Sequence, residues 1–507
     1  MAQSNNITGK TFHSIIWVIS GTGIQSILNL LVLSILARLI TPAEYGLLGV
    51  AMLFIGFANI FAQLGVGYAI IQLPNLDNRH FRLGFSLSIL IGIMFWAILS
   101  LSAQSFAQFM RMPDLQIILY VLATLYLIKG PVVVAQSLLA RELRFQAIAI
   151  INTLAYFIGF VLVGITLAAY GFGIWALIAA HLTQAAVSTI GSLYARPHAK
   201  KPLWDRATFE ELMYLGGGDI SIRIGTHIAL RGDYFVVGRW IGDTPLGLYT
   251  RAYQLMLMPT QVFIQAVFRV LLSSLSRIQD DKQKIRLLFQ RGVNLMAIVM
   301  LPLGAIMALL APEIILIILG AEWANAIQPF QILAMGSLFR NGYKINDTIA
   351  RAAGQAYQLA RMKWIYAFMI ITMALIGQNW GLNGVAYGVL IAIILHYLAM
   401  NQLTLYWLDM RWREWAKLHI HGATLTVFLI GLAWPVIIIL RSFSLPHLLT
   451  LTITLLSISI AGIIFICYAP KRFIGNEVGW LLTVLTSYLP EKYKNHRLLS
   501  MLISRLS

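Results

Sequence analysis

The chain has 507 residues, of which 59% are hydrophobic and only 11% are charged, and its mean hydropathy is +0.78. This composition excludes a soluble globular protein, because a membrane-spanning helix needs only about 20 apolar residues and the chain has room for many. The single cysteine, Cys467, excludes a disulfide framework and a cysteine-based metal site. The net charge of +18 would suit nucleic acid, but its distribution follows a membrane topology, so no nucleic-acid partner is expected.

Hydropathy and turn signals together predict an all-α integral membrane protein with fourteen transmembrane helices. In chain order, the expected spans lie near residues 13–38, 46–71, 83–107, 115–139, 146–168, 173–194, 211–236, 246–273, 288–310, 326–348, 360–378, 382–405, 420–440 and 447–468. A basic amphipathic tail, 471–507, follows them and suits a helix on the anionic cytoplasmic surface.

The lysines and arginines divide unevenly between the two sides of this predicted topology. Alternate loops and the two termini together carry 25 of them, and the opposite side carries only Arg38, Arg111, Arg239 and Arg441. Basic residues mark the cytoplasmic side of a membrane protein. Both termini are therefore predicted to be cytoplasmic, with an even number of spans between them.

Two short motifs recur in the chain at a nearly constant spacing. Arg38 with Gly46 reappears as Arg239 with Gly247, and a Gly-Ile turn at 173–174 is echoed by Gly-Val at 384–385. Such repeats are typical of secondary transporters, whose binding site lies between two related halves. The predicted organisation is an N-terminal six-helix lobe (1–205), a C-terminal six-helix lobe (206–418) and an extra transmembrane helix pair (419–470), followed by the tail.

Lysines and arginines also lie inside the hydrophobic spans. A charge at the centre of a membrane helix costs about 2.5–3.5 kcal/mol, so such residues usually face a partner or a water-filled cavity. The candidates for a cationic, substrate-binding cavity are Lys129, Arg223, Arg231, Arg340 and Lys344. The fewer carboxylates are candidates for ion coupling or charge balance: Asp219, Asp233 and Asp347. This excess of cations favours an anionic ligand.

Spacing places several of these residues on polar helix faces, because residues four apart are helical neighbours. Asp219, Arg223, His227 and Arg231 follow such a spacing. A structural alternative stays open for Asp219 with Arg223 and for Asp347 with Lys344 or Arg351, which can form ion pairs within one helix. Lys129 has no acidic neighbour in its own span and precedes a Gly-Pro step that predicts a bend. The uncharged residues expected to line the cavity are Gln25, Asn29, Asn59, Gln63, Gln261 and Gln265.

No arrangement of residues predicts catalysis. The sequence lacks a glycine-rich phosphate loop with its Lys-Ser/Thr, an HExxH metal motif and a Cys/His nucleophile pair. We therefore expect a protein that is not an enzyme and that uses no cofactor and no metal.

Several segments carry a resemblance to a known family. They are Ala37 to Leu39 with Pro42 and Glu44 to Gly46, then Asp233-Tyr234 through Arg239, Leu246 to Tyr249, Arg251 to Tyr253, and Pro259. These segments resemble the polysaccharide-transporter branch of the multidrug/oligosaccharidyl-lipid/polysaccharide exporter superfamily, over roughly residues 10–470. Within that branch, the chain is most similar to Wzx-type lipopolysaccharide and exopolysaccharide flippases of the colanic-acid and teichuronic-acid exporter kind.

The resemblance implies a function and a set of partners. A member of this family would move an undecaprenyl-pyrophosphate-linked oligosaccharide from the cytoplasmic to the outer leaflet by alternating access, for cell-surface polysaccharide biosynthesis. It would be a multi-pass protein of the bacterial plasma (inner) membrane. Its partners would be the lipid-linked oligosaccharide and membrane lipids, with a polysaccharide polymerase and glycosyltransferases as further candidates.

Two other functions compete with this one. A drug/cation antiporter of the same superfamily would need acidic cavity residues, whereas the intramembrane charge here is net positive. A membrane-embedded polysaccharide polymerase or ligase would need an ordered exterior loop with an acid/base pair, and the predicted exterior loops are short and apolar. A flippase is therefore the favoured prediction.

Overall fold

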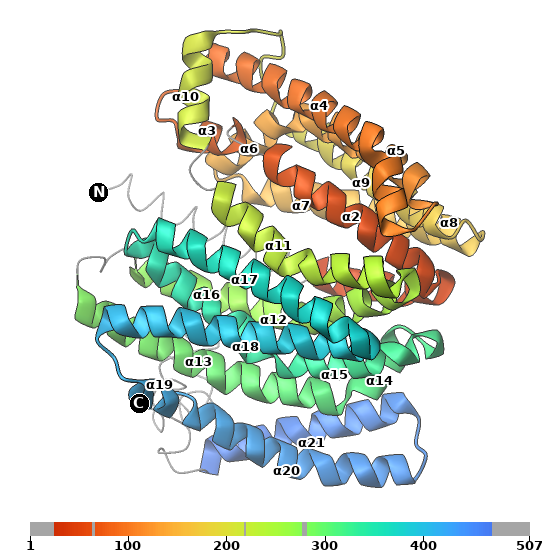
Figure 1. Ribbon diagram of the computed structural model, residues 1–507, viewed down its shortest axis with the longest axis vertical. Helices are drawn as coiled ribbons and strands as arrows, with labels where there is room; N and C mark the ends of the chain where they lie inside the picture. The colour runs from red at the N-terminus through yellow and green to blue at the C-terminus, as the bar shows by residue number, and fades with distance from the viewer. Residues whose placement is uncertain (1–24, 63–65, 217–219, 276–280, 469–507) are drawn as a thin grey trace, which may run out of the picture. The chain divides into compact units, whose positions relative to one another are not determined.

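The computed structural model describes residues 25–62, 66–216, 220–275 and 281–468, and over these ranges it contains helices and turns but no β-strand (Figure 1). Nine helical segments in the described ranges are long and apolar enough to cross a membrane. One of them, Tyr357–Leu408, runs through two predicted spans. The structure therefore confirms an all-helical protein with many membrane-capable helices, and the count of fourteen stays a prediction.

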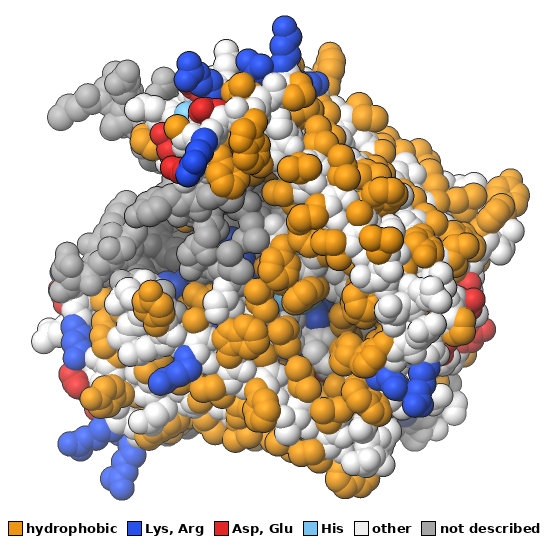
Figure 2. Space-filling view, turned by 45° about the horizontal axis from the view of Figure 1, so that its top comes forward, with side chains coloured by type: hydrophobic (Ala, Val, Ile, Leu, Met, Phe, Trp, Pro, Cys, Tyr) orange, Lys and Arg blue, Asp and Glu red, His pale blue; other side chains and the backbone are white. Residues whose placement is uncertain are grey.

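Large hydrophobic side chains are exposed along these helices. Leu101, Phe368 and Val427 are among them. Figure 2 shows that hydrophobic side chains cover much of the face in view. Such a surface suits contact with lipid, where the helix satisfies its own backbone groups and apolar side chains face the hydrocarbon.

The helices form two compact units, and the first comprises residues 1–251, 318–323 and 363–385. Its described elements begin with a helix over Gln25–Leu39. The elements that follow are α2 (Pro42–Ala62), α3 (Val66–Gln72), α4 (Asn78–Met110), α5 (Leu115–Lys129), η1 (Gly130–Val132), α6 (Val133–Arg141), α7 (Phe145–Tyr156), η2 (Phe157–Ile165), α8 (Thr166–Ala169), α9 (Ile174–Ala195), α10 (Arg206–Gly216), α11 (Ile220–Val236) and η3 (Val237–Ile241).

The second unit comprises residues 252–317, 324–362 and 386–507. Its elements are α13 (Lys282–Leu309), α14 (Ala311–Ile318), α15 (Ile327–Met335), α16 (Ser337–Ala352), α19 (Trp412–Lys417), α20 (Ile420–Ser442) and α21 (His447–Tyr468). The chain passes between the units within α12 (Asp243–Leu275), at the last residue of α14, and within η4 (Ala321–Ala326), α17 (Ala356–Gly377) and α18 (Gly381–Leu408), the last two joined by η5 (Gln378–Trp380). The lobe boundaries at 205 and 418 stay a prediction, and the tail 471–507 lies outside the described residues.

The two echoed motifs pack against each other within the first unit. A methyl group at Gly46 would lie 1.9 Å from the carbonyl oxygen of Asp243, and one at Gly247 would lie 1.8 Å from the carbonyl oxygen of Pro42. Pro42 and Asp243 begin α2 and α12, and both pairs of equivalent residues stand 201 positions apart. Each glycine therefore packs on the start of the other motif's helix. Such close approach of two backbones needs residues without a side chain.

The Gly-Pro step after Lys129 interrupts the helix, as predicted. α5 ends at Lys129, a 3₁₀ turn covers Gly130–Val132, and α6 continues from Val133. Close packing holds this turn in place, because a methyl group at Gly130 would lie 2.9 Å from the carbonyl oxygen of Ser88 in α4. The 3₁₀ turn therefore packs closely against α4.

In the second unit, an ion pair between a buried carboxylate and an exposed arginine joins α14 to the end of α20. The Glu313 carboxylate is 1% exposed and accepts hydrogen bonds from Arg441 Nε at 2.9 Å and Nη2 at 2.8 Å. Arg441 Nη2 also donates to the Leu309 carbonyl at 3.1 Å. An apolar cluster that includes Leu310, Leu429 and Ile437 lies nearby. The C-terminal helix pair is therefore attached to the rest of its unit by both packing and charge.

Candidate functional site

A pocket of about 800 Å³ opens within the first unit. Residues from α2, α3, α4, α5, η1, α6, α7, α9 and α11 line it. The polar and titratable lining residues are Asn59, Tyr68, Ser88, Tyr126, Lys129, Gln136, Ser137, Asn152, His181, Gln184, Ser188, Thr189 and Arg223. The volume lies in the upper part of the range of small-molecule sites, about 300–1,000 Å³.

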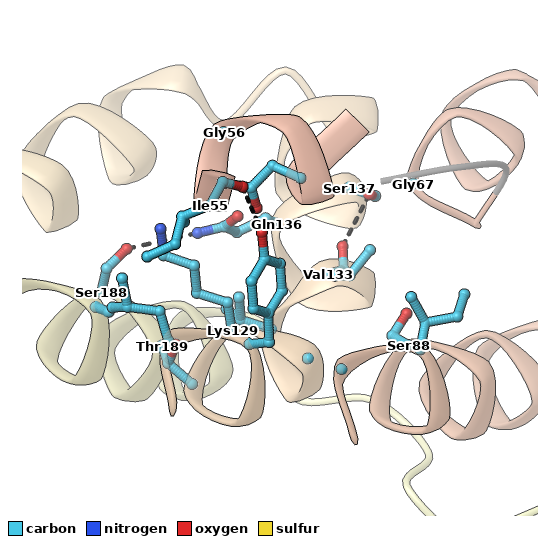
Figure 3. A pocket seen from close by; sticks show the side chains of 18 of the residues that line it. Ile55, Gly56, Gly67, Ser88, Lys129, Val133, Gln136, Ser137, Ser188 and Thr189 are labelled. Atoms are coloured by element: carbon cyan, nitrogen blue, oxygen red, sulfur yellow. Dashed lines mark hydrogen bonds between the residues drawn. The ribbon is translucent and has the colours of Figure 1, made fainter. Parts of the chain in front are cut away.

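The bend at the end of α5 presents Lys129 to this pocket. One turn earlier, the Tyr126 hydroxyl donates a hydrogen bond to the Ile55 carbonyl and so ties α5 to α2. Figure 3 shows Lys129 and Gln136 extending into the pocket, with Ser188 and Thr189 on a neighbouring helix. Among the described residues, Lys129 has no hydrogen-bond or ion-pair partner. Its ammonium group is thus available to an anionic ligand.

Arg223 supplies the second positive charge of the pocket, from α11. Contacts of α11 just before and just after Arg223 in the sequence hold this part of the helix in place. The Trp364 indole Nε1 donates to Ser221 Oγ at 3.0 Å, and a methyl group at Gly225 would lie 3.2 Å from Lys363 Cβ. Contacts with α17 therefore fix the stretch of α11 that carries Arg223.

The charged residues described in the pocket lining all have one sign. Among the described lining residues, Lys129 and Arg223 are the only lysine or arginine, and none is an aspartate or glutamate. A cleft with charge of one sign and low-dielectric walls concentrates the opposite charge. The pocket therefore favours anions over cations.

A polar face of α9 completes the pocket. His181, Gln184 and Ser188 lie three and four residues apart and so share one side of the helix. The Gln136 amide Nε2 donates to Ser188 Oγ at 3.5 Å, and Ser188 Oγ donates to Asn152 Oδ1 at 3.5 Å. These α9 residues and Asn152 are not among the residues predicted from the sequence, although polar residues spaced three and four apart within an apolar helix indicate a polar face.

The predicted residues Arg231 and Asp233 of the first unit are not among the residues that line the pocket. The Arg231 guanidinium lies 4.8 Å from the centroid of the Tyr234 ring. Asp233 is 1% exposed and accepts hydrogen bonds from the Tyr234 backbone N–H at 3.0 Å and the Tyr249 hydroxyl at 2.9 Å. These contacts give Asp233 a structural role at the α11–α12 connection. Of the uncharged candidates, Asn59 lines the pocket, while Gln25 and Asn29 are half-buried on the first described helix.

In the second unit, the predicted residues lie mainly on α16. Arg340 is 3% exposed, with its guanidinium 4.3 Å from the centroid of the Tyr253 ring. Lys344 donates to Asn341 Oδ1 at 3.2 Å, and Asp347 is half-buried. Gln261 is exposed on α12.

Three further candidates cannot be placed. Asp219, Gln63 and the side chain of Gln265 lie outside the described residues. The structure thus brings Lys129, Arg223 and Asn59 together in one pocket.

Comparison with known sequences and structures finds relatives that are named for polysaccharide biosynthesis. The family model described as "Polysaccharide biosynthesis protein" matches residues 35–328. The teichuronic acid biosynthesis protein TuaB of Bacillus subtilis (strain 168) is 24% identical over 402 residues, which cover 74% of this chain and 82% of that protein. The lipopolysaccharide biosynthesis protein WzxC of Escherichia coli (strain K12) is 23% identical over 394 residues, or 76% and 79%.

Solved transporters share the fold. The lipid II flippase MurJ in an inward closed conformation matches with a TM-score of 0.69 at 17% identity, covering 89% of this chain and 98% of that one. An inward-facing multidrug resistance MATE transporter of the MOP superfamily matches with a TM-score of 0.61 at 14% identity, covering 76% and 95%. At these identities the likeness establishes the fold alone.

Proposed function

Because the chain belongs to the polysaccharide biosynthesis protein family, we propose that it is a flippase for an undecaprenyl-pyrophosphate-linked oligosaccharide. It moves this lipid from the cytoplasmic to the outer leaflet of the bacterial plasma membrane, with both of its termini in the cytoplasm. The supporting observation is the pocket, whose lining combines Lys129 and Arg223 with neutral polar groups and no described carboxylate. The similarity to WzxC and TuaB supports the same assignment.

The two cations suit a pyrophosphate in different ways. The planar guanidinium of Arg223 matches two phosphate oxygens at once, whereas the ammonium of Lys129 acts as a compact point charge. The polyprenyl tail remains in lipid while the headgroup crosses in the pocket. A charged headgroup needs this environment, because it cannot cross the hydrocarbon unaided.

Transport follows from alternating access, in which one six-helix lobe (1–205) rocks against the other (206–418). A headgroup that carries negative charge out of a negative interior gains about 2.3 kcal/mol per charge per 100 mV. The membrane potential therefore favours outward movement. Asp219 and Asp347 are the proposed residues for coupling to a cation, while the hydrogen bonds of Asp233 suit charge balance within the fold.

The competing functions fit the pocket less well. A drug/cation antiporter requires a carboxylate to attract its substrate, and the described lining has none. A polymerase or ligase requires an acid/base pair on the reacting groups, and the same lining lacks one. We therefore propose that the protein is not an enzyme and uses neither a cofactor nor a metal.

The test is transport of a labelled lipid-linked oligosaccharide in proteoliposomes that contain only this protein. Loss of a charged hydrogen bond to phosphate costs about 1.5–3 kcal/mol, so Lys129→Gln should weaken substrate affinity about 10- to 150-fold. Lys200→Gln removes a positive charge from an exposed loop and should transport like wild type. No transport by wild type, or equal transport by the wild type and Lys129→Gln, would refute the proposal.

A further inference from the structure

A hydrogen-bonded network of neutral polar side chains lies in the same pocket as Lys129. It consists of Gln136 on α6, Ser188 on α9 and Asn152 on α7, joined by two hydrogen bonds of 3.5 Å each. Hydrogen bonds between such groups are usually 2.7–3.2 Å long. Both hydrogen bonds of the network are therefore weak, and a ligand can replace either one at a small cost in free energy.

Most hydrogen-bond donors and acceptors of this network have no protein partner among the described residues. A Gln or Asn side chain offers two N–H donors and a carbonyl oxygen with two lone pairs. Within the described part of the molecule, Gln136 uses one donor and Asn152 uses one acceptor site. Both side chains line the pocket, and Gln136 is exposed in it. Several donors and acceptors of these pocket-lining side chains thus have no protein partner among the described residues and can bind a ligand.

The network lies close to Lys129, the cation proposed to bind phosphate. Gln136 follows Lys129 on the same interrupted helix, after the 3₁₀ turn Gly130–Val132. Figure 3 shows both side chains entering the pocket together. A ligand whose phosphate contacts Lys129 therefore places the group attached to that phosphate near Gln136.

We propose that Gln136, Asn152 and Ser188 form a subsite for the sugar attached to the pyrophosphate. This inference rests on the proposed flippase function. Sugar hydroxyls both donate and accept hydrogen bonds, as do amides and a serine hydroxyl, so the two sets match. The subsite accepts a hydroxyl-rich sugar that is neutral or acidic. It rejects a cationic amino sugar, because Lys129 and Arg223 repel it and no described lining carboxylate attracts it.

The test separates the sugar subsite from the phosphate site. Purified full-length protein is titrated with three probes: a short polyprenyl pyrophosphate, the same lipid bearing one neutral hexose, and the same lipid bearing one cationic aminohexose. Wild type should bind the hexose probe more tightly than the bare pyrophosphate and the aminohexose probe more weakly than the hexose probe. Gln136→Leu and Asn152→Leu should each weaken binding of the hexose probe about 2- to 12-fold and leave the bare pyrophosphate unchanged.

Two further variants make the result specific. Lys129→Gln should weaken binding of the hexose probe and the bare pyrophosphate alike. Gln116→Leu makes the same kind of change as Gln136→Leu on α5 outside the pocket lining, where the amide donates to the Tyr120 hydroxyl at 3.4 Å, so binding of all three probes should be unchanged. Thermal unfolding of each variant identifies any that loses binding through loss of the fold.

The outcomes distinguish the subsite from the flippase function. Equal loss of both pyrophosphate probes in Gln136→Leu and Asn152→Leu would assign these residues to the framework of the pocket and overturn the subsite. The same holds if wild type binds the hexose probe no better than the bare pyrophosphate. If Lys129→Gln does not change the affinity for the bare pyrophosphate probe, the phosphate site and the proposed function are refuted instead.

Discussion

Adding one methyl group where α2 crosses α12 tests the close packing of the two repeated motifs. In Gly46→Ala, the new Cβ would lie 1.9 Å from the Asp243 carbonyl oxygen, far inside the 3.4 Å at which ordinary contact begins. The neighbour is backbone at a helix start, so it cannot move aside as a flexible side chain can. Overpacking of this kind costs typically about 1–3 kcal/mol, and a clash with backbone lies at the upper end.

The reciprocal geometry adds a second expectation. Gly247→Ala creates the equivalent clash, with its Cβ 1.8 Å from the Pro42 carbonyl oxygen. Separating the helices to relieve one clash also relieves the other, so the second methyl group should cost less than the first. The double variant should therefore be more stable than the sum of the single changes predicts, by about 0.5–3 kcal/mol.

Unfolding of the purified protein in detergent measures all three variants. The matched control is Gly431→Ala in α20, where no other atom lies within 4 Å of the added methyl group. Alanine is favoured over glycine in a helix by about 0.5–1 kcal/mol, so this control should be neutral or slightly stabilising. Wild-type stability of Gly46→Ala, or simple additivity with Gly247→Ala, would show that the helices do not meet through these glycines.

Two further predictions concern charged and titratable groups. Glu313→Gln should lower the free energy of unfolding by about 1.5–3 kcal/mol, because it removes the charge from a buried carboxylate to which Arg441 donates two hydrogen bonds. Asp409→Asn breaks an ion pair whose two side chains are both exposed, so it should change the free energy of unfolding little. Equal effects of the two changes would contradict the role of burial. Burial lowers the pKa of His198, so folding opposes its protonation and its contribution to stability is lost as the pH falls below the usual histidine pKa of about 6.5. The melting temperature of wild type should therefore fall more than that of His198→Phe between about pH 7.5 and 5.5, and parallel curves would exclude His198 as a cause.

Much of the helical framework could be predicted from the sequence, because long apolar segments and their breaks are local properties. Every predicted span coincides at least in part with a described helix. The interruption after Lys129 followed from Gly130 and Pro131, since proline removes a backbone donor and crowds the preceding turn. The charge of Lys129 and Arg223 also stood out, because a lysine or arginine in an apolar segment is costly wherever it lies.

The rest of the pocket depends on packing between distant segments. Asn152 and Ser188 are ordinary polar residues in apolar helices, and only the meeting of α7, α9 and α6 gives them a common space. Conversely, Asp233 has the sequence signature of a functional carboxylate, yet the Tyr249 hydroxyl and the Tyr234 backbone N–H both donate to it. Sequence spacing could not show that Asn152 and Ser188 share a pocket, because they lie on different helices. It could not show the hydrogen bonds of Asp233 either, because one donor lies on α12 and the other depends on the local backbone conformation.

The contact between the two glycine motifs also sets an order on biosynthesis. Gly46 meets its partner helix only after about 200 further residues have been made, which takes roughly 10 to 40 s at the usual 5–20 residues per second. During that interval the ribosome is still extending the chain, and the face of α2 that carries Gly46 does not yet have its native packing partner. The half-made protein must therefore hold this face against lipid or the insertion machinery until α12 arrives. Completion of α12, rather than entry of the first helices, is the step after which the native crossing can form.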